Sequence, residues 1–211
     1  MRPNRLFHSL GALLLVLTFA CSGKPKGAEA VDLGLPSGLK WASCNLGADS
    51  ARDLGFYLAW GESEPKDHYF YDNYRFAALD GSQSTLDIGE SISGTQYDMA
   101  RALWGEEWRL PTKEELEELI DECTWSREML DNVAGYRVTG PSGKSIFLPA
   151  GGKNAEVDDT ECCYWSGTLS QSLGRTAYSL YCFWDDDEND GGVKIWGEYK
   201  VFGLLVRPVK P

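Results

Sequence analysis

The hydrophobic positions in the middle of the chain recur at helical spacing. Between residues 112 and 123, "TKEELEELIDEC", Thr112 followed three residues later by Glu115 forms a capping box, a typical helix start. The apolar stripe that follows consists of Leu116, Leu119, Ile120 and Cys123. The pattern predicts one helix here and a shorter one over residues 95–104.

Shorter apolar runs separated by turn residues predict strands on both sides of these helices. Residues 31–47 read as two strands around a turn at 36–38, and residues 55–62 as a buried strand. Residues 63–94 are polar and tyrosine-rich, which predicts a long loop over the core. The later strand-like runs are 135–140, 145–152, 163–169, 176–184, 191–199 and 202–209. Because no helix separates these later runs, we expect an α+β fold with small antiparallel sheets rather than a parallel sheet.

The first 30 residues have the pattern of an export signal and a tether. Arg2 and Arg5 precede an apolar run of about 11 residues, which is too short to span a bilayer. The run ends "LTFAC", which resembles a lipoprotein lipobox with Cys21 as the lipidated residue. We therefore predict a signal peptide over 1–21, a flexible tether over 22–30 and one domain over 31–211. An ordinary cleaved signal, with Cys21 present by chance, is the alternative.

Charge limits the partners of this chain. It carries 20 Lys and Arg against 32 Asp and Glu, a net charge of -12. A charge of this sign disfavours general attraction to nucleic acid or to anionic lipid. We therefore expect no nucleic-acid partner, and contact with a membrane only through the N-terminal lipid.

Five cysteines remain after Cys21, and they leave their pairing open. They are Cys44, Cys123, Cys162, Cys163 and Cys182. An exported chain permits disulfides, and an odd count leaves at least one thiol unpaired within the chain. Adjacent cysteines and a single histidine after the signal do not fit a zinc site. The sequence is compatible with one or two disulfides or with buried thiols, in any connectivity.

Six segments occur in the order typical of one bacterial family. They read "VDLGLPSGLKWASCNLGA", "YLAWGE", "LWGEEWRLPTKEELEELI", "GYRVTGPSGKSIFLPAGG", "YWSGT" and "GLLVRPV". In this combination the chain from Val31 to its end resembles the Fibrobacter succinogenes major paralogous domain, found in Bacteroidetes and Fibrobacter. The resemblance implies a C-type lectin-like fold in which the first and last strands pair, two helices flank them, and a second small sheet displays loops.

The resemblance does not imply an activity, because this fold includes lectins, adhesin tips, variable receptors and formylglycine-generating enzymes. The tripeptide Glu64-Pro65-Lys66 lies in the wrong region for a calcium-dependent lectin, and a Trp-Asn-Asp motif is missing. Adjacent Cys162 and Cys163 do not reproduce the active cysteines of the generating enzymes. Lys200 also stands where relatives usually have arginine, which weakens an anion contact there.

The remaining features favour binding over catalysis. His68 is the only histidine after the signal, and its polar and aromatic neighbours do not identify a nucleophile and an orienting acid for a catalytic triad. Aromatic residues are abundant, and rings outside the core stack on sugars or fill protein hot spots. We expect a non-enzymatic outer-membrane lipoprotein, facing the periplasm or the cell surface, that binds a glycan or a surface protein through late loops. The alternative is a structural subunit of a fimbria-like or polysaccharide-handling assembly; a formylglycine-generating enzyme is less favoured.

The stretch "YCFWDDDENDGG", residues 181–192, is the candidate ligand-binding feature. We expect the tip of a late hairpin here, with two glycines permitting chain reversal. The expected ligand-facing residues are Trp184, Asp185, Asp186, Asp187, Glu188, Asp190, Trp196 and Tyr199. Neither register of an EF-hand loop fits the acids, so we expect no cofactor, with calcium as the alternative. A solvated turn without a ligand is the other interpretation.

Overall fold

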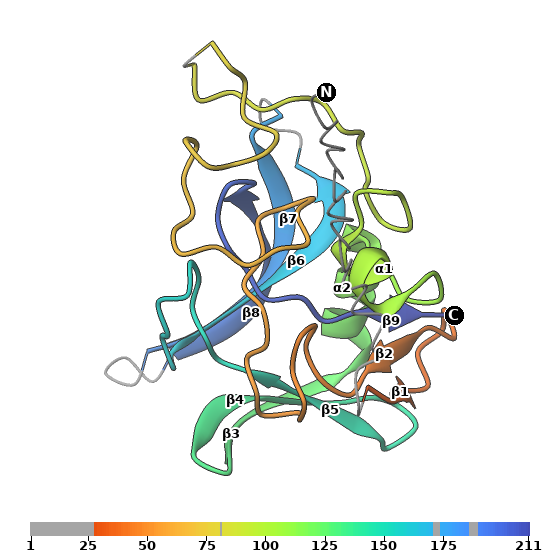
Figure 1. Cartoon of the computed structure of the whole chain (residues 1–211). Helices are drawn as coiled ribbons and strands as arrows, with labels where there is room; N and C mark the ends of the chain where they lie inside the picture. Colours follow the sequence, from red (N-terminus) through yellow and green to blue (C-terminus); the bar gives the residue numbers. More distant parts are fainter. Residues whose placement is uncertain (1–27, 81, 171–173, 186–189) are drawn as a thin grey trace, which may run out of the picture.

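The described part of the chain has an α+β fold with two helices and three small antiparallel sheets, as the sequence predicts (Figure 1). The computed structural model describes residues 28–80, 82–170, 174–185 and 190–211. In chain order its elements are β1 (Ala30–Asp32), β2 (Lys40–Ala42), α1 (Met99–Trp104), α2 (Lys113–Glu122), β3 (Thr124–Leu130), β4 (Val133–Thr139), β5 (Ser145–Pro149), β6 (Glu161–Leu169), β7 (Thr176–Asp185), β8 (Asp190–Tyr199) and β9 (Val209–Lys210). The predicted signal peptide, Cys21 and most of the tether lie outside the described residues.

The first sheet joins the two ends of the domain. Its order is β1-β2-β9, and Trp41 lies opposite both Val31 and Val209. The predicted turn between β1 and β2 is present, where the Gly38 amide donates to the Leu35 carbonyl at 2.9 Å. The C-terminal strand β9 therefore pairs with β2 of the N-terminal hairpin and not with the first strand, β1.

Both predicted helices are present, and one begins later than expected. In α2, Thr112 and Glu115 form the predicted capping box, and Leu116 and Leu119 are buried. Helix α1 begins at Met99 rather than near residue 95, because the Asp98 side chain accepts the first free amides of the helix. The capping residue, rather than the apolar pattern, thus determines where α1 begins.

The second sheet, β3-β4-β5, contains a strand that the sequence analysis missed. Strand β3 carries Ser126, Arg127 and Glu128 at its centre, and it alternates only between exposed and half-buried positions. Such a polar strand has no buried face to mark it in the sequence. Asp131 and Asn132 join it to β4 with φ angles of 49° and 69°, the backbone of a tight hairpin turn.

Two predicted strands are not regular strands. Residues 57–60 are buried as expected, whereas Phe56 is exposed, and Gly55 and Gly61 adopt φ angles of 73° and 87°, which interrupt an extended chain. Only an isolated bridge pairs Leu58 with Leu204, so the late run 202–209 is also irregular up to β9. The hydrophobic pattern of these two runs therefore predicts strands, but the glycine backbone angles and the isolated backbone bridges prevent a regular ladder.

The third sheet, β6-β7-β8, divides the core in two. Strand β6 is buried on both faces: Cys162 and Tyr164 face one hydrophobic cluster, while Cys163 and Trp165 face the other. Helix α2 packs against this sheet. The predicted core tryptophans Trp41, Trp60, Trp104, Trp108 and Trp165 are all buried. No helix among the described residues is both long and apolar enough to cross a membrane.

Candidate functional site

A cluster of aromatic side chains that includes an exposed tryptophan lies on one face of strands β7 and β8. These strands form an antiparallel hairpin, as predicted, that runs from the pair Thr176–Tyr199 to the pair Asp185–Asp190. Since Tyr181 lies opposite Lys194, and side chains alternate along a strand, one face carries Tyr181, Phe183, Lys194 and Trp196. We call this surface the outer face, defined by these four residues.

The lysine of the outer face lies among its three aromatic rings. The Lys194 ammonium nitrogen is 5.4 Å from the ring centre of Tyr181, 5.0 Å from that of Phe183 and 4.9 Å from that of Trp196. The Tyr181 and Phe183 rings stack at 5.8 Å with planes 16° apart. Cation–π attraction therefore fixes a flat aromatic platform beside a positive charge.

Trp196 is the most exposed aromatic group of the platform, with 52% of the residue accessible to solvent. It projects from a sheet strand rather than a loop, and cross-strand contacts hold its backbone: the Ser179 hydroxyl donates to the Trp196 carbonyl at 3.3 Å. A large ring held rigidly in water loses little entropy on binding a ligand.

The predicted site residues do not form one surface. Trp184 and Tyr199 project from the face of the hairpin opposite Trp196. Side chains alternate between the two faces of a strand, and Trp184 directly follows Phe183 of the outer face, while Tyr199 is three positions after Trp196. The guanidinium of Arg127, on the neighbouring sheet, lies 5.0 Å from the Trp184 ring centre. Tyr199 is at the open end of the hairpin, about 30 Å along β8 from Asp190, so it does not flank the acidic tip.

The acidic tip itself falls largely outside the described residues. Asp185 and Asp190 form the last backbone pair of the hairpin, while Asp186, Asp187 and Glu188 are not described. Within the described residues no cluster of three or more His, Cys, Asp or Glu side chains is arranged to hold a metal ion.

The glycines next to the tip have a different role from the one expected. Gly191 and Gly192 lie within β8, opposite Trp184 and Phe183. A Cβ atom on Gly191 would lie 2.5 Å from the Trp184 ring, and one on Gly192 would lie 2.9 Å from the Phe183 ring. The glycines therefore leave space for cross-strand aromatic rings, and neither belongs to the reversal itself.

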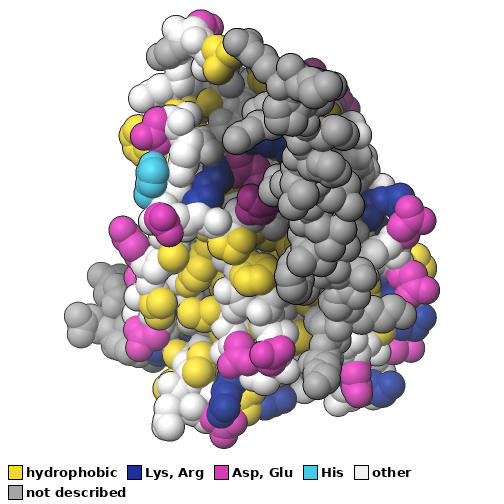
Figure 2. Space-filling view, viewed as in Figure 1, with side chains coloured by type: hydrophobic (Ala, Val, Ile, Leu, Met, Phe, Trp, Pro, Cys, Tyr) yellow, Lys and Arg dark blue, Asp and Glu magenta, His cyan; other side chains and the backbone are white. Residues whose placement is uncertain are grey.

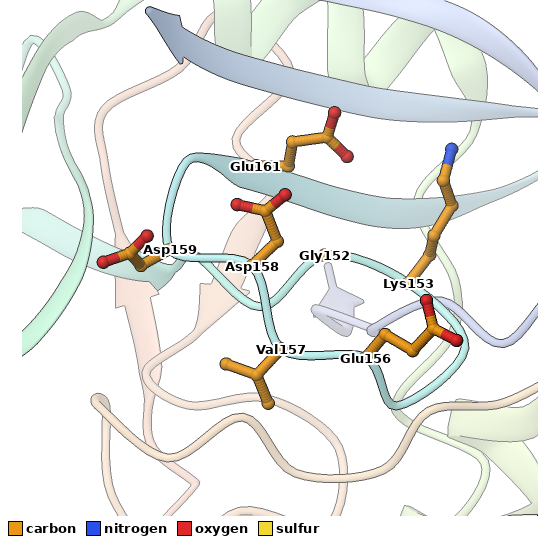
Figure 3. Close-up of a pocket in the computed structure, with 7 residues that line it drawn as sticks. All are labelled: Gly152, Lys153, Glu156, Val157, Asp158, Asp159 and Glu161. Carbon is orange, nitrogen blue, oxygen red and sulfur yellow. The ribbon is translucent and has the colours of Figure 1, made fainter. Parts of the chain in front are cut away.

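A pocket of about 600 Å³ adjoins the hairpin (Figure 3). The loop between β5 and β6 builds it, and its lining residues are Gly152, Lys153, Glu156, Val157, Asp158, Asp159 and Glu161. Figure 3 shows the side chains of Asp158 and Glu161 on the same side of the loop, whereas Asp159 points away. The pocket therefore presents carboxylates with one lysine at its margin.

Local hydrogen bonds fix the shape of this loop. Gly152 has a φ angle of 61°, and a Cβ atom there would lie 2.5 Å from the Glu156 carbonyl oxygen. Asp158 accepts hydrogen bonds from the hydroxyl and the amide of Thr160, at 2.6 and 2.8 Å. These bonds lower the pKa of the Asp158 carboxyl, which is consequently charged at neutral pH.

Two side-chain contacts connect the pocket to the sheet. The Tyr181 hydroxyl donates to Glu161 at 2.6 Å, and Lys153 pairs with Glu198 at 3.1 Å. Burial and the negative charge of Glu161 together raise the pKa of Tyr181, so it remains a donor. Burial opposes the charge of Lys153, but its hydrogen bond to Glu198 outweighs this and raises the pKa. The platform and the pocket thus share a hydrogen-bonded border.

Six residues of the platform and of this border were not predicted from the sequence: Lys153, Glu161, Tyr181, Phe183, Lys194 and Glu198. The alternation of Tyr181 with Phe183 and of Lys194 with Trp196 was visible. The pairing register of β7 with β8, which places all four residues on one face, could not be read from the sequence. His68, the single histidine after the predicted signal, lies exposed on a loop, 3.2 Å from Asp72, away from the pocket lining (Figure 2, cyan).

Lys200 is buried rather than available to an anion. It is 1% exposed, and its ammonium nitrogen lies 5.3 Å from the Trp60 ring centre. Burial lowers the pKa of Lys200 to about 8, although Asp87 opposes the shift. Lys200 therefore contributes to the core.

Replacing Lys200 by methionine should stabilise the domain at pH 7, by about 2–3 kcal/mol, since each pKa unit is worth about 1.4 kcal/mol. The unfolded chain binds the Lys200 proton more tightly than the folded one. The cost of the buried charge is therefore complete below pH 8 and disappears as the pH rises toward about 10.4. Urea unfolding of both proteins at pH 7 and pH 10.5 measures this difference.

Lys210→Met is the matched control, because Lys210 also lies over a tryptophan ring, 5.1 Å from that of Trp108, but it is paired with Glu107. Its free energy of unfolding should change by less than about 0.5 kcal/mol. A Lys200→Met difference that is equal at the two pH values would contradict the buried-charge explanation.

No family model, curated protein or solved structure matches this chain. The resemblance described above therefore stays a prediction. The function has to be argued from the outer face and its pocket.

Proposed function

We propose that this chain is a non-enzymatic, lipid-anchored envelope protein that binds a ligand, preferably a glycan, on the outer face of the sheet β6-β7-β8. The proposal includes a C-type lectin-like fold and attachment to the outer membrane through Cys21. Pairing of β2 with β9, two helices and a late sheet beside a long loop support that fold assignment.

The exposure of Trp196 on a rigid aromatic platform carries the proposal. Most of the domain's tryptophans are buried, as a stable core requires, whereas Trp196 is 52% exposed beside Tyr181 and Phe183. Exposing a large aromatic group on a sheet has a cost in stability and solubility, which a binding function explains.

The chemistry around Trp196 suits a sugar. Its ring offers an apolar face on which the C–H face of a sugar can stack. Lys194 provides hydrogen-bond donors on the same face, and the acids Glu156, Asp158 and Glu161 line the adjoining pocket and provide acceptors for hydroxyl groups. Donors, acceptors and a ring side by side match the alternating hydroxyl and C–H surfaces of a neutral glycan.

A glycan array tests the proposal with a soluble form of the chain that begins at Ser22. We expect binding of a set of hydroxyl-rich glycans, reduced by Trp196→Ala in every positive member. A silent array together with turnover of a chromogenic substrate panel would contradict the proposal. Protease shaving of intact cells, run in parallel, decides whether the domain faces the cell surface or the periplasm.

One observation favours the alternative, a structural subunit of a surface assembly. Strand β8 is ten residues long and lies at the edge of its sheet, and within the described residues its ladder is with β7 alone. An edge strand of this length can accept a strand from a partner protein. A silent array with a co-purifying envelope protein would support this alternative.

A further inference from the structure

Three of the five described cysteines lie together on β6 and β7, and the register of these strands separates them. Cys162 lies directly opposite Cys182, whereas Cys163 lies opposite Tyr181. Successive side chains on a strand point to opposite faces, so Cys162 and Cys163 point away from each other. The neighbours in sequence are therefore not neighbours in space, and Cys162 faces Cys182.

The pair Cys162–Cys182 has the backbone spacing of a disulfide. The Trp184 amide donates to the Thr160 carbonyl at 3.0 Å, so every second pair along this ladder, including Cys162–Cys182, is a hydrogen-bonded pair. Cα atoms in such a pair are about 5.5 Å apart, within the disulfide range of about 4.4 to 6.8 Å, and the Cβ atoms, about 5 to 5.5 Å apart in this register, must approach to about 4 Å for the bond to close. Both side chains are on the same face and fully buried.

Cys162 and Cys182 are free thiols in this structure, opposite each other across the strand pair. The Cys162 thiol donates to the Leu148 carbonyl at 3.7 Å. The other three cysteines have different surroundings. Cys44 donates to the Ala48 carbonyl at 3.5 Å, Cys123 is close to acids of α2, and Cys163 belongs to the other hydrophobic cluster.

We propose that Cys162 and Cys182 are an oxidation site that forms a disulfide when the protein is exported, while Cys44, Cys123 and Cys163 stay as thiols. This proposal rests on the proposed export, but not on the proposed ligand. In the step, one thiolate attacks the disulfide of an exported thiol oxidoreductase, or of oxidised glutathione. This attack releases one thiol of the oxidant and leaves a mixed disulfide. The second cysteine thiolate then attacks the mixed disulfide and releases the other oxidant thiol, so that two cysteines are oxidised and the oxidant's disulfide is reduced to two thiols.

Burial determines when this reaction occurs. Both thiols are 0% exposed, and burial, together with the contact to Cys162, raises the pKa of Cys182 well above its usual range. Thiolate is the attacking species, so the folded pair reacts slowly. The link therefore forms while β6 and β7 come together during folding, and it then joins the central strand of the sheet to its inner neighbour.

Peptide mapping tests the pairing in two preparations of the full chain. One is isolated from the cell envelope in the presence of an alkylating agent, and the other is reduced, unfolded and refolded in a glutathione redox buffer. Trypsin cuts after Lys153, Arg175 and Lys194, so Cys182 is on a different peptide from Cys162 and Cys163. We expect the two peptides to be linked in both preparations, with Cys163 alkylated within the linked pair and Cys44 and Cys123 alkylated on other peptides.

Variants identify the linked sulfur. Cys163→Ser should keep the link, and Cys162→Ser should abolish it; the mass readout does not require either variant to be stable. Reduction of the wild-type protein should lower its melting temperature by about 5–10 °C, because the link closes a loop of about 20 residues.

A link that Cys163→Ser removes, or no link in the glutathione preparation, would overturn the pairing. A link with glutathione but free thiols in envelope-derived protein would overturn oxidation in the cell. Neither result bears on glycan binding, which the array measures separately.

Discussion

Replacing Arg207 by methionine should lower the free energy of unfolding by about 3–5 kcal/mol. Arg207 is 1% exposed, and its guanidinium donates to Asn45 at 2.9 Å and to the carbonyls of Ala42 and Phe147 at 2.9 and 2.7 Å. These acceptors belong to segments that adjoin two different sheets. Removing the guanidinium leaves these three oxygens without their hydrogen bond from Arg207. Urea denaturation followed by circular dichroism measures the loss.

The matched control is Arg101→Met, which removes an arginine at the surface that bonds to Glu106 at 2.8 Å. Surface ion pairs contribute little, so its stability should change by less than about 1 kcal/mol. If both variants lost the same small amount of stability, Arg207 would not join the sheets as its contacts indicate.

Asp98→Ala should lower the free energy of unfolding by about 3 kcal/mol. The buried Asp98 carboxylate accepts hydrogen bonds from the amides of Ala100 and Arg101, at 2.9 and 3.2 Å, and thereby begins α1. It also accepts from the amides of Gly94 and Leu110, at 2.7 and 2.8 Å. One side chain thus satisfies four backbone donors, and alanine satisfies none. Thermal and urea unfolding give the change in stability.

Asp72→Ala is the control for this experiment, since Asp72 is an exposed acid whose partner is His68. It should leave stability within about 0.5 kcal/mol of wild type. Equal unfolding midpoints for the Asp98 and Asp72 variants would show that the four amides find other acceptors.

The elements that the sequence predicted are those with a local signal. The capping box of Thr112 and Glu115 acts within four residues, and the hairpin β7–β8 follows from alternation and a polar tip. Strand β3 and the start of α1 were not predicted correctly. In the first case the strand has no apolar face, and in the second a single carboxylate overrides the apolar pattern.

The candidate site was only partly predictable, because it depends on register between strands. Trp196 was selected correctly as a tryptophan outside the core, but Tyr199 was grouped with it although it projects from the opposite face. Lys194 gave no signal in the sequence, since a lysine in a strand is common. Its position over three rings appears only when β7 and β8 are paired.

Isothermal titration of Trp196→Ala with the glycan that gives the strongest array signal is the most direct test of the proposed binding face. Phe70→Ala is the control, because Phe70 is equally exposed, at 56%, but lies on the loop 63–94. Loss of a stacking ring at the centre of a site costs about 2 kcal/mol, or roughly 30-fold in affinity. We therefore predict that Trp196→Ala weakens binding about 30-fold while Phe70→Ala changes it less than about twofold. Equal affinities for the two variants would contradict binding on the outer face.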